Sequence, residues 1–231
     1  MKALRLGIAG LAVLGVGFTV GWVEKPSRLN ARLYATDRLP SIQAHLDDAP
    51  NGYILLAGDS QAELQSPAQR VCGTEIVNGG ISGASASVYA DLVAKLSVKT
   101  RARAVVVFIG TNDLQRKKEP LSDRTAQGFD DAVERIVKQL QAGSDRVVVA
   151  AVPPISRSVE KRLEPAAVVA YSARIEALCR RLSCRYVDPY ADLRDGDTGF
   201  ALPGALRDAL HITDYRRVMR ALEPVLCAAA P

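Results

Sequence analysis

Five short apolar runs, separated by longer amphipathic stretches, constrain the fold of this chain more than any other feature. The runs occupy residues 53–57, 75–78, 104–109, 146–152 and 185–188, and helical patterns occupy 84–98, 123–142, 162–182 and 214–228. Alternating strands and helices favour right-handed crossovers and a parallel sheet covered on both faces. The run AVVVFI is apolar throughout, as doubly buried strands are. We therefore expect an α/β fold, a three-layer α/β/α sandwich with a five-stranded parallel sheet of flavodoxin-like type.

The first 23 residues differ from the rest of the chain. A basic start, MKALR, precedes an uncharged apolar run over residues 6–23. This pattern predicts an N-terminal membrane anchor or signal segment, with membrane contact through residues 6–23. The small-residue cleavage candidate, TVG at 19–21, lies inside the apolar run, which favours an uncleaved anchor over a cleaved signal. A buried core helix is the alternative, although the segment has no polar face.

The remaining residues divide into two parts. Residues 24–50 are expected to form a tether and a lead-in helix, and residues 51–231 a single folded domain. Residues 1–38 carry six basic and two acidic side chains, a charge of +4 out of the formal net charge of +5. The nearly neutral remainder gives no electrostatic reason to expect nucleic acid as a partner.

Cysteine usage bears on the compartment. Cys72, Cys179, Cys184 and Cys227 form an even set, as expected of an exported domain. Cys179 and Cys184 are close enough in sequence to bridge, which leaves Cys72 and Cys227; four buried thiols are the alternative. A zinc site is not expected, because there is no Cys-x-x-Cys and the chain has two histidines. We expect a cell-envelope protein that is anchored in the inner membrane and faces the periplasm, or is secreted or periplasmic if the N-terminal segment is cleaved.

Four polar clusters fall at the predicted ends of strands and before the last helix. They are GDS at 58–60, NGGISG at 78–83, GTND at 110–113 and DALH at 208–211. In open α/β sheets, sites form outside the carboxyl ends of strands, so the four clusters together predict one site. The first cluster lacks the glycine-rich phosphate loop of nucleotide-binding proteins and the Gly-x-Ser-x-Gly of α/β-hydrolases.

A serine nucleophile explains this set of residues. The hydroxyl of Ser60 needs a base to take its proton, and His211 is the candidate. The other histidine, His45, lies upstream of the sheet and is interpreted as a surface or packing residue. Asp208 precedes His211 by three residues, so its carboxylate can orient the imidazole. The alternative for this pair is a capping aspartate beside a polar surface histidine.

Attack on a carbonyl produces an oxyanion, which needs hydrogen-bond donors already in place. The backbone N–H groups of Ser60 and Gly83 and the side-chain amide of Asn112 are the predicted donors. Asp59 and Asp113 are interpreted as structural residues that bind loop N–H groups.

These four clusters resemble the blocks of the SGNH, or GDSL-type, hydrolase superfamily, whose name lists a Ser, a Gly, an Asn and a His. The resemblance covers roughly residues 52–226, and all four residues are present as Ser60, Gly83, Asn112 and His211. Gln61 stands where the commonest form of the first block has leucine, a departure expected to fall outside the chemistry. The resemblance implies that residues 51–231 are an SGNH hydrolase domain.

The resemblance also implies an activity. The expected enzyme is a serine esterase that hydrolyses carboxylic esters through an acyl-enzyme, without a metal or cofactor. Separately, the low aromatic content and the expected envelope location favour short-chain acyl or acetyl groups. The expected substrate is a small-molecule ester or an ester on a cell-envelope glycan. Two alternatives stay open: an O-acyltransferase that acts on polysaccharide with the same residues, and a non-catalytic envelope binding protein.

Basic side chains follow the third and fourth predicted strands. Arg116, Lys117, Lys118 and Arg157 are interpreted as a solvated rim of the site. Contact with an anionic substrate is the alternative.

Overall fold

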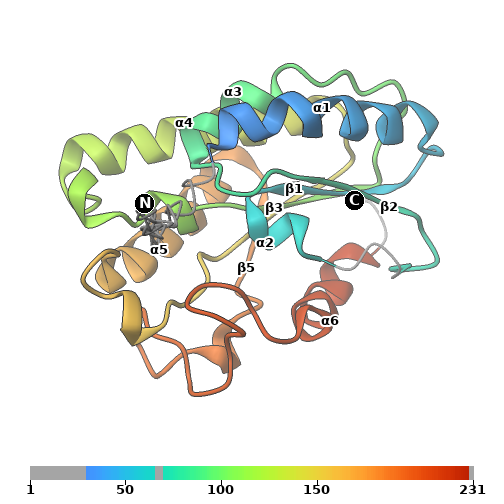
Figure 1. The fold of residues 1–231 in the computed structure, drawn as a ribbon. Coiled ribbons are helices and arrows are strands. Elements are labelled where there is room, and N and C mark those ends of the chain that lie inside the picture. The colour runs from blue at the N-terminus through green and yellow to red at the C-terminus, as the bar shows by residue number, and fades with distance from the viewer. Residues whose placement is uncertain (1–29, 66–69, 229–231) are drawn as a thin grey trace, which may run out of the picture.

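A parallel sheet forms the centre of the molecule (Figure 1). The computed structural model describes residues 30–65 and 70–228. Its strands follow the order β2-β1-β3-β4-β5, and each neighbouring pair is parallel. The strands are β1 (Ile54–Gly58), β2 (Ile76–Gly80), β3 (Ala104–Phe108), β4 (Val147–Ala150) and β5 (Arg185–Val187). The predicted α/β fold with a five-stranded parallel sheet is confirmed.

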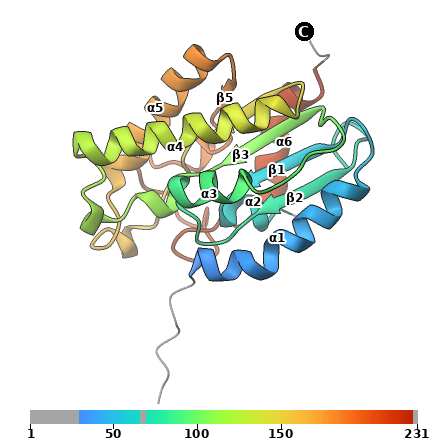
Figure 2. The ribbon, with the colours of Figure 1, turned by 90° about the horizontal axis from the view of Figure 1, so that it is seen from above.

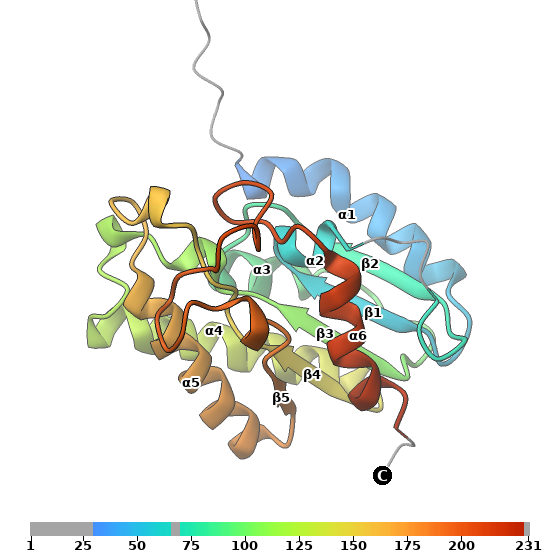
Figure 3. The same ribbon diagram turned by 90° about the horizontal axis from the view of Figure 1, so that it is seen from below.

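Helices cover the two faces of the sheet unequally. One face packs against α1 (Ala31–Asp48), α3 (Ala86–Val93), α4 (Asp123–Ala142) and α5 (Pro165–Leu182). The other face packs against α6 (Tyr215–Leu226) and the short α2 (Ser60–Glu63). From above, α1, α3 and α4 lie over the sheet, and from below α6 lies in front of it (Figures 2 and 3). Successive β1 residues alternate between the two cores, so all five are buried.

The longer helices form where the sequence supplies an apolar stripe and a cap. In α4 the buried positions include Phe129, Val133 and Ile136, which lie three or four residues apart on one face. The Ser122 hydroxyl accepts from the Thr125 N–H and caps the first turn. In α6 the Asp214 carboxylate accepts from the Arg216 N–H in the same way. These caps fix where the helices begin.

The predicted elements differ from the observed ones mainly at their ends. The strand predicted at 75–78 continues through Gly79 and Gly80, because both glycines stay in register with β1. The helix predicted at 84–98 ends at Val93. Four 3₁₀ turns also lie within the described residues: η1 (Thr111–Asp113), η2 (Arg116–Lys118), η3 (Arg157–Val159) and η4 (Ala191–Leu193).

The helix expected within residues 24–50 is α1. Ala35, Ile42 and Leu46 are buried in the core that also contains residues of β1 and α3, so α1 packs as part of the folded body. The predicted anchor at residues 1–23 lies outside the described residues. Within 30–65 and 70–228, no helix is both long enough and apolar enough to span a bilayer.

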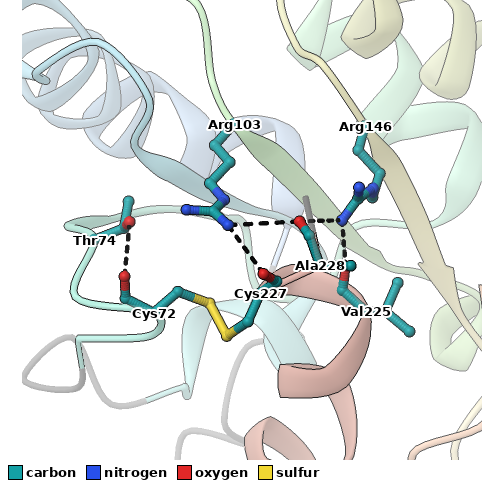
Figure 4. The surroundings of a disulfide bond; sticks show 7 residues. All are labelled: Cys72, Thr74, Arg103, Arg146, Val225, Cys227 and Ala228. Atoms are coloured by element: carbon teal, nitrogen blue, oxygen red, sulfur yellow. Dashed lines mark hydrogen bonds between the residues drawn. A yellow bond between two sulfur atoms is a disulfide. The ribbon is translucent and has the colours of Figure 1, made fainter. Parts of the chain in front are cut away.

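All four cysteines are paired in disulfides. Cys179 joins Cys184 at the end of α5, and Cys72 joins Cys227 at the end of α6. This is the pairing that the proximity of Cys179 and Cys184 in sequence allows, and the alternative of four buried thiols is wrong. Figure 4 shows Arg103 beside the Cys72–Cys227 bridge, where its guanidinium donates to the Cys227 carbonyl at 3.1 Å. This bridge connects the segment between α2 and β2 to the C-terminal helix.

Candidate active site

The carboxyl end of β1 delivers Ser60 to the edge of the sheet. Gly58 has φ of +129°, and a Cβ added to it would lie 1.8 Å from the Phe108 carbonyl oxygen, so this turn requires glycine. Asp59 then caps α2, accepting from the Gln61 N–H at 2.9 Å. Ser60 is the first residue of α2, where a backbone N–H has no partner within the helix. The strand ends in a turn that presents a hydroxyl and a free N–H together.

Ser60, His211 and Asp208 form a continuous hydrogen-bonded chain. Ser60 Oγ lies 2.9 Å from His211 Nε2, across 151 residues of sequence. His211 Nδ1 lies 2.7 Å from Asp208 Oδ2. A carboxylate on Nδ1 places the ring proton there and leaves Nε2 free to accept the serine proton. Figure 3 shows the segment before α6, which carries His211, running beside α2.

The second oxygen of Asp208 holds the backbone of its own turn. Asp208 Oδ1 accepts from the N–H groups of Leu210 and His211 at 2.7 and 2.8 Å. Partial burial acts to raise the pKa of Asp208, but the hydrogen bonds from the His211 ring and from the two N–H groups outweigh it and lower this pKa. The carboxylate therefore stays ionised beside the imidazole.

The predicted oxyanion donors lie in the loops after β2 and β3. Gly83 has φ of +79°, a backbone conformation that favours glycine, and its N–H donates to no acceptor in the described part of the chain. Asn112 lies in η1, and its Nδ2 donates to the Ala84 carbonyl at 3.0 Å. An amide nitrogen carries two hydrogens, so one remains for a ligand. The bond to Ala84 fixes Asn112 against the loop that carries Gly83.

Asp59 and Asp113 support these loops from beneath. Asp113 accepts from the Ala86 N–H at 3.0 Å, at the start of α3. Burial raises the pKa of Asp59 to about 7 and that of Asp113 to about 7, while the N–H groups of Gln61 and Ala86 act in the opposite direction. Both carboxyls bind backbone N–H groups next to the site, as predicted for structural residues.

Comparison with known protein families identifies the family of this chain. The model of the GDSL-like lipase/acylhydrolase family matches residues 49–215. The chain belongs to this family. It is therefore an ester-hydrolysing enzyme, as predicted, and a non-catalytic binding protein is not supported.

Solved structures show the same fold at low sequence identity. A protein from Streptococcus pneumonia, provisionally described as a platelet activating factor, gives a TM-score of 0.71 with 17% identity over 85% of this chain and 94% of that chain. A GDSL-like lipase from Bacteroides thetaiotaomicron gives 0.61 with 18% identity over 85% and 95%. An acetylxylan esterase from Geobacillus stearothermophilus gives 0.58 with 14% identity over 78% and 96%. No curated protein matches the chain.

In this acylhydrolase, Gln61 joins the nucleophile segment to the histidine segment. Gln61 is fully buried, and its Nε2 donates to the Leu210 carbonyl at 2.9 Å, next to His211. Its Oε1 accepts from the Tyr215 hydroxyl at 2.9 Å. Neither bond involves a proposed catalytic group, as expected of a departure outside the chemistry, but the two bonds join the segments that carry Ser60 and His211. A buried polar side chain needs such partners, but its burial and both partners are visible only in the structure.

A second network, which the sequence analysis did not identify, holds the oxyanion loop of the acylhydrolase. Glu63 Oε2 accepts from the Ser82 N–H at 2.7 Å, and Glu63 Oε1 accepts from the Tyr34 hydroxyl. Arg38 donates to the Gly80 and Asn78 carbonyls at 3.1 Å each. Both Tyr34 and Arg38 belong to α1, so this helix contributes directly to the support of the site.

The remaining charged candidates separate into two groups. Arg157 pairs with Asp195 at 2.6 Å and stacks over Phe200, and Arg116 pairs with Glu164 at 2.6 Å. Lys117 and Lys118 make no ion pair with a described residue. His45 is exposed on α1, as predicted. Within the part of the chain that the structure describes, no three His, Cys, Asp or Glu side chains are grouped so as to hold a metal ion.

Proposed function

We propose that this chain is a serine esterase that cleaves short-chain acyl esters, with acetyl groups favoured, on a small molecule or a cell-envelope glycan. The observation that carries the proposal is the 2.9 Å contact between Ser60 Oγ and His211 Nε2, with Asp208 on the opposite nitrogen of the ring. Covalent acyl transfer needs a nucleophile, a base that contacts it, and a carboxylate that orients the base, and the three side chains are hydrogen-bonded in this order.

In the acylation step, Ser60 Oγ attacks the ester carbonyl carbon while His211 Nε2 takes the hydroxyl proton. The new C–O bond converts the carbonyl oxygen to an oxyanion, which the N–H groups of Ser60 and Gly83 and the Asn112 amide stabilise. The intermediate collapses as the bond to the alcohol oxygen breaks. His211 then protonates the departing alcohol, and the acyl group stays on Ser60.

In the deacylation step, the roles repeat with water. His211 takes a proton from water, whose oxygen attacks the acyl carbon, and the same donors bind the oxyanion. The bond to Ser60 Oγ breaks and His211 returns a proton to it, which releases the carboxylic acid. Asp208 stabilises the imidazolium at each stage without becoming protonated.

The comparison with acetylxylan esterase supports the roles and the acyl group. Catalytic mutants of that enzyme replace a serine, an aspartate and a histidine with alanine, and its aspartate and histidine stand three residues apart. Asp208 and His211 have the same spacing. The preference for acetyl groups on a glycan is carried to this chain as part of the proposal.

Replacement of the nucleophile tests the proposal. Ser60→Ala is expected to abolish hydrolysis of 4-nitrophenyl acetate, because no other group on the site can form the acyl-enzyme. Circular dichroism and the thermal midpoint of the variant should match those of the unaltered protein. Wild-type protein should gain the mass of one phosphonyl group at Ser60 when treated with an organophosphonate. Undiminished turnover by Ser60→Ala would remove the assignment.

A product analysis distinguishes hydrolysis from acyl transfer. With water as acceptor, one equivalent of free acid should appear for each ester cleaved, whether or not a polysaccharide is present. Acylated polysaccharide at the expense of free acid would instead identify an acyltransferase.

We also propose that the domain works in the cell envelope, facing the periplasm or released into it. Two disulfides support this location, since such bonds persist in oxidising compartments. The basic and apolar pattern of residues 1–23 supports export. A fusion of residues 1–50 to alkaline phosphatase should be active in cells, because that reporter needs the periplasm to form its own disulfides. An inactive but stably expressed fusion would contradict export.

A further inference from the structure

A cavity next to the oxyanion donor concentrates positive charge. It has a volume of about 340 Å³, and its lining includes Asn112 and Leu210. Asn112 is a proposed oxyanion donor, and Leu210 precedes His211. A substrate whose ester carbonyl reaches the site therefore has this cavity beside it. The volume lies at the small end of the range of about 300–1,000 Å³ that is typical of small-molecule sites.

Four cations line this cavity, and no carboxylate lines it. The cations are Arg116, Lys117, Lys161 and Arg162. Arg116 is neutralised by Glu164, whose Oε2 lies 2.6 Å from its Nη1. Lys117, Lys161 and Arg162 make no ion pair with any residue that the structure describes. All three side chains are exposed, so solvent screens their mutual repulsion, and together they give this cavity a positive potential that favours an anion.

The backbone holds the two charged segments together. The Arg116 N–H donates to the Arg162 carbonyl at 2.9 Å, and the Glu164 N–H donates to the Leu114 carbonyl at 2.8 Å. Gln115 and Leu163 form an antiparallel bridge between these bonds. The cations therefore come from two segments whose backbones are fixed to each other, so that their exposed side chains leave the same part of the surface.

From this geometry we infer that the cavity is a subsite for an anionic group on the ester substrate, such as a carboxylate or a phosphate close to the scissile bond. This inference rests on the proposed esterase function and adds the substrate class to it. Lysine ammonium groups and an arginine fork together suit the oxygens of either anion. The apolar surface of Leu163 and Leu210 suits the carbon skeleton that carries the charge. In this inference Lys117, which the sequence analysis interprets as part of a solvated rim, binds the anion together with Lys161 and Arg162.

Paired esters test the subsite and locate the anion. On the acyl side, mono-4-nitrophenyl succinate is compared with 4-nitrophenyl butyrate; on the alcohol side, 3-carboxyphenyl acetate is compared with 3-carbamoylphenyl acetate. We expect kcat/KM for the anionic member of one pair to exceed that of its neutral partner by about tenfold, the sum of three partly exposed ion pairs. The preference should fall as ionic strength rises. The pair that shows the preference identifies the part of the ester that carries the anion.

The charge-removing variant is Lys117→Gln/Lys161→Gln/Arg162→Gln. It is expected to lower the ratio of anionic to neutral kcat/KM by about tenfold, as removal of those ion pairs requires. The control is Lys95→Gln/Arg185→Gln/Arg216→Gln, which removes three exposed cations that line no part of this cavity and should leave the ratio unchanged. Equal ratios in the variant and the unaltered protein, or an equal fall in the control, would overturn the subsite.

The neutral esters keep the two proposals separable. If wild-type protein hydrolyses the neutral esters through Ser60 but prefers neither anionic partner, the subsite is wrong and the esterase function stands. If Ser60→Ala hydrolyses all four esters as fast as wild-type protein does, the esterase assignment fails and the subsite fails with it.

Discussion

The two sides of the active site are built in different ways. Ser60, Gly83 and Asn112 follow three adjacent strands of the sheet, and their loops are held by buried carboxyls and by the network from α1. Asp208 and His211 lie instead in an irregular segment between β5 and α6, closed by the Leu206–Ile212 bridge. The sheet therefore fixes the donors and the nucleophile, whereas individual side-chain contacts fix the base. Substitutions on the two sides should therefore differ in the size of their effect on catalysis and stability.

The base side is expected to give the largest loss. His211→Ala removes the group that takes and returns the serine proton, so kcat for 4-nitrophenyl acetate should fall by at least about 10⁴-fold. Ser60→Ala combined with His211→Ala should be no worse than either change alone, because the two residues act as one unit. Additive losses in the double variant would show that the contact between them is not used in catalysis.

The donor side should give a smaller loss. Asn112→Ala removes one of three proposed oxyanion donors, and kcat should fall by about 10²–10³-fold with KM little changed. Asn112→Asp keeps the bulk of the side chain but presents a carboxylate to the oxyanion, so it should be at least as inactive. Activity of Asn112→Asp close to wild type would place the oxyanion elsewhere.

The two disulfides close loops of very different length, and only the longer one connects the segment after α2 to the end of α6. The Cys72–Cys227 bond spans 155 residues and the Cys179–Cys184 bond spans 5. Chain entropy predicts stabilisation of about 5 kcal/mol for the longer loop and about 2 kcal/mol for the shorter one. Cys72→Ser/Cys227→Ser should therefore lower the free energy of unfolding in urea by more than Cys179→Ser/Cys184→Ser. Equal losses would mean that the unfolded chain is already compact between these cysteines.

Gln61 tests whether single contacts position the base. Gln61→Leu deletes the bonds to Leu210 and Tyr215, and kcat should fall about tenfold, an effect of roughly 1.4 kcal/mol that is typical of one buried hydrogen bond. KM should stay nearly constant, and Tyr215→Phe, which leaves the bond to Leu210 intact, serves as the matched control. A larger fall in kcat for Tyr215→Phe than for Gln61→Leu would assign the positioning to the tyrosine.

A pH-dependent effect on stability concerns the buried carboxyls of the donor side. The folded-state pKa of Asp113 is about 7, above its ordinary value of 3.8, so the folded protein binds this proton more tightly than the unfolded chain does. The contribution of Asp113 to stability is therefore fully present below pH 3.8 and is lost as the pH rises toward 7. The slope is at most about 1.4 kcal/mol per pH unit for one group.

Urea unfolding from pH 4 to 8 measures this contribution. Asp113→Asn keeps an oxygen for the Ala86 N–H but does not titrate. The free energy of unfolding of the variant, minus that of wild type, should therefore increase as the pH rises. A constant difference between the two proteins across that range would show that Asp113 is ionised throughout.

The difference between the two sides also explains what the sequence could predict. Strand-end clusters such as GDS at 58–60 can be read because apolar runs mark the strands and parallel strands bring their ends to one edge. The spacing of Asp208 and His211 predicts their contact, since it is local. Gln61 could not be assigned, because its partners lie about 150 residues away, Leu210 in a segment without periodicity and Tyr215 at the start of α6. The sequence also did not predict that Lys161 lies on the same cavity as Lys117, because the two loops that carry them are brought together only by backbone pairing in the folded protein.

The bridge between Cys72 and Cys227 closes residues 72–227 into a covalent ring, and Ser60 lies just outside it. A protease that cuts the irregular segment between β5 and α6 would open this ring without separating the molecule into two pieces. The fragment that bears α6 would remain attached through the disulfide and through the burial of Val218, Leu222 and Leu226 against the sheet. After a single cut in that segment, the disulfide would still hold the fragment with α6 to the fragment with Ser60, even where proteases are abundant.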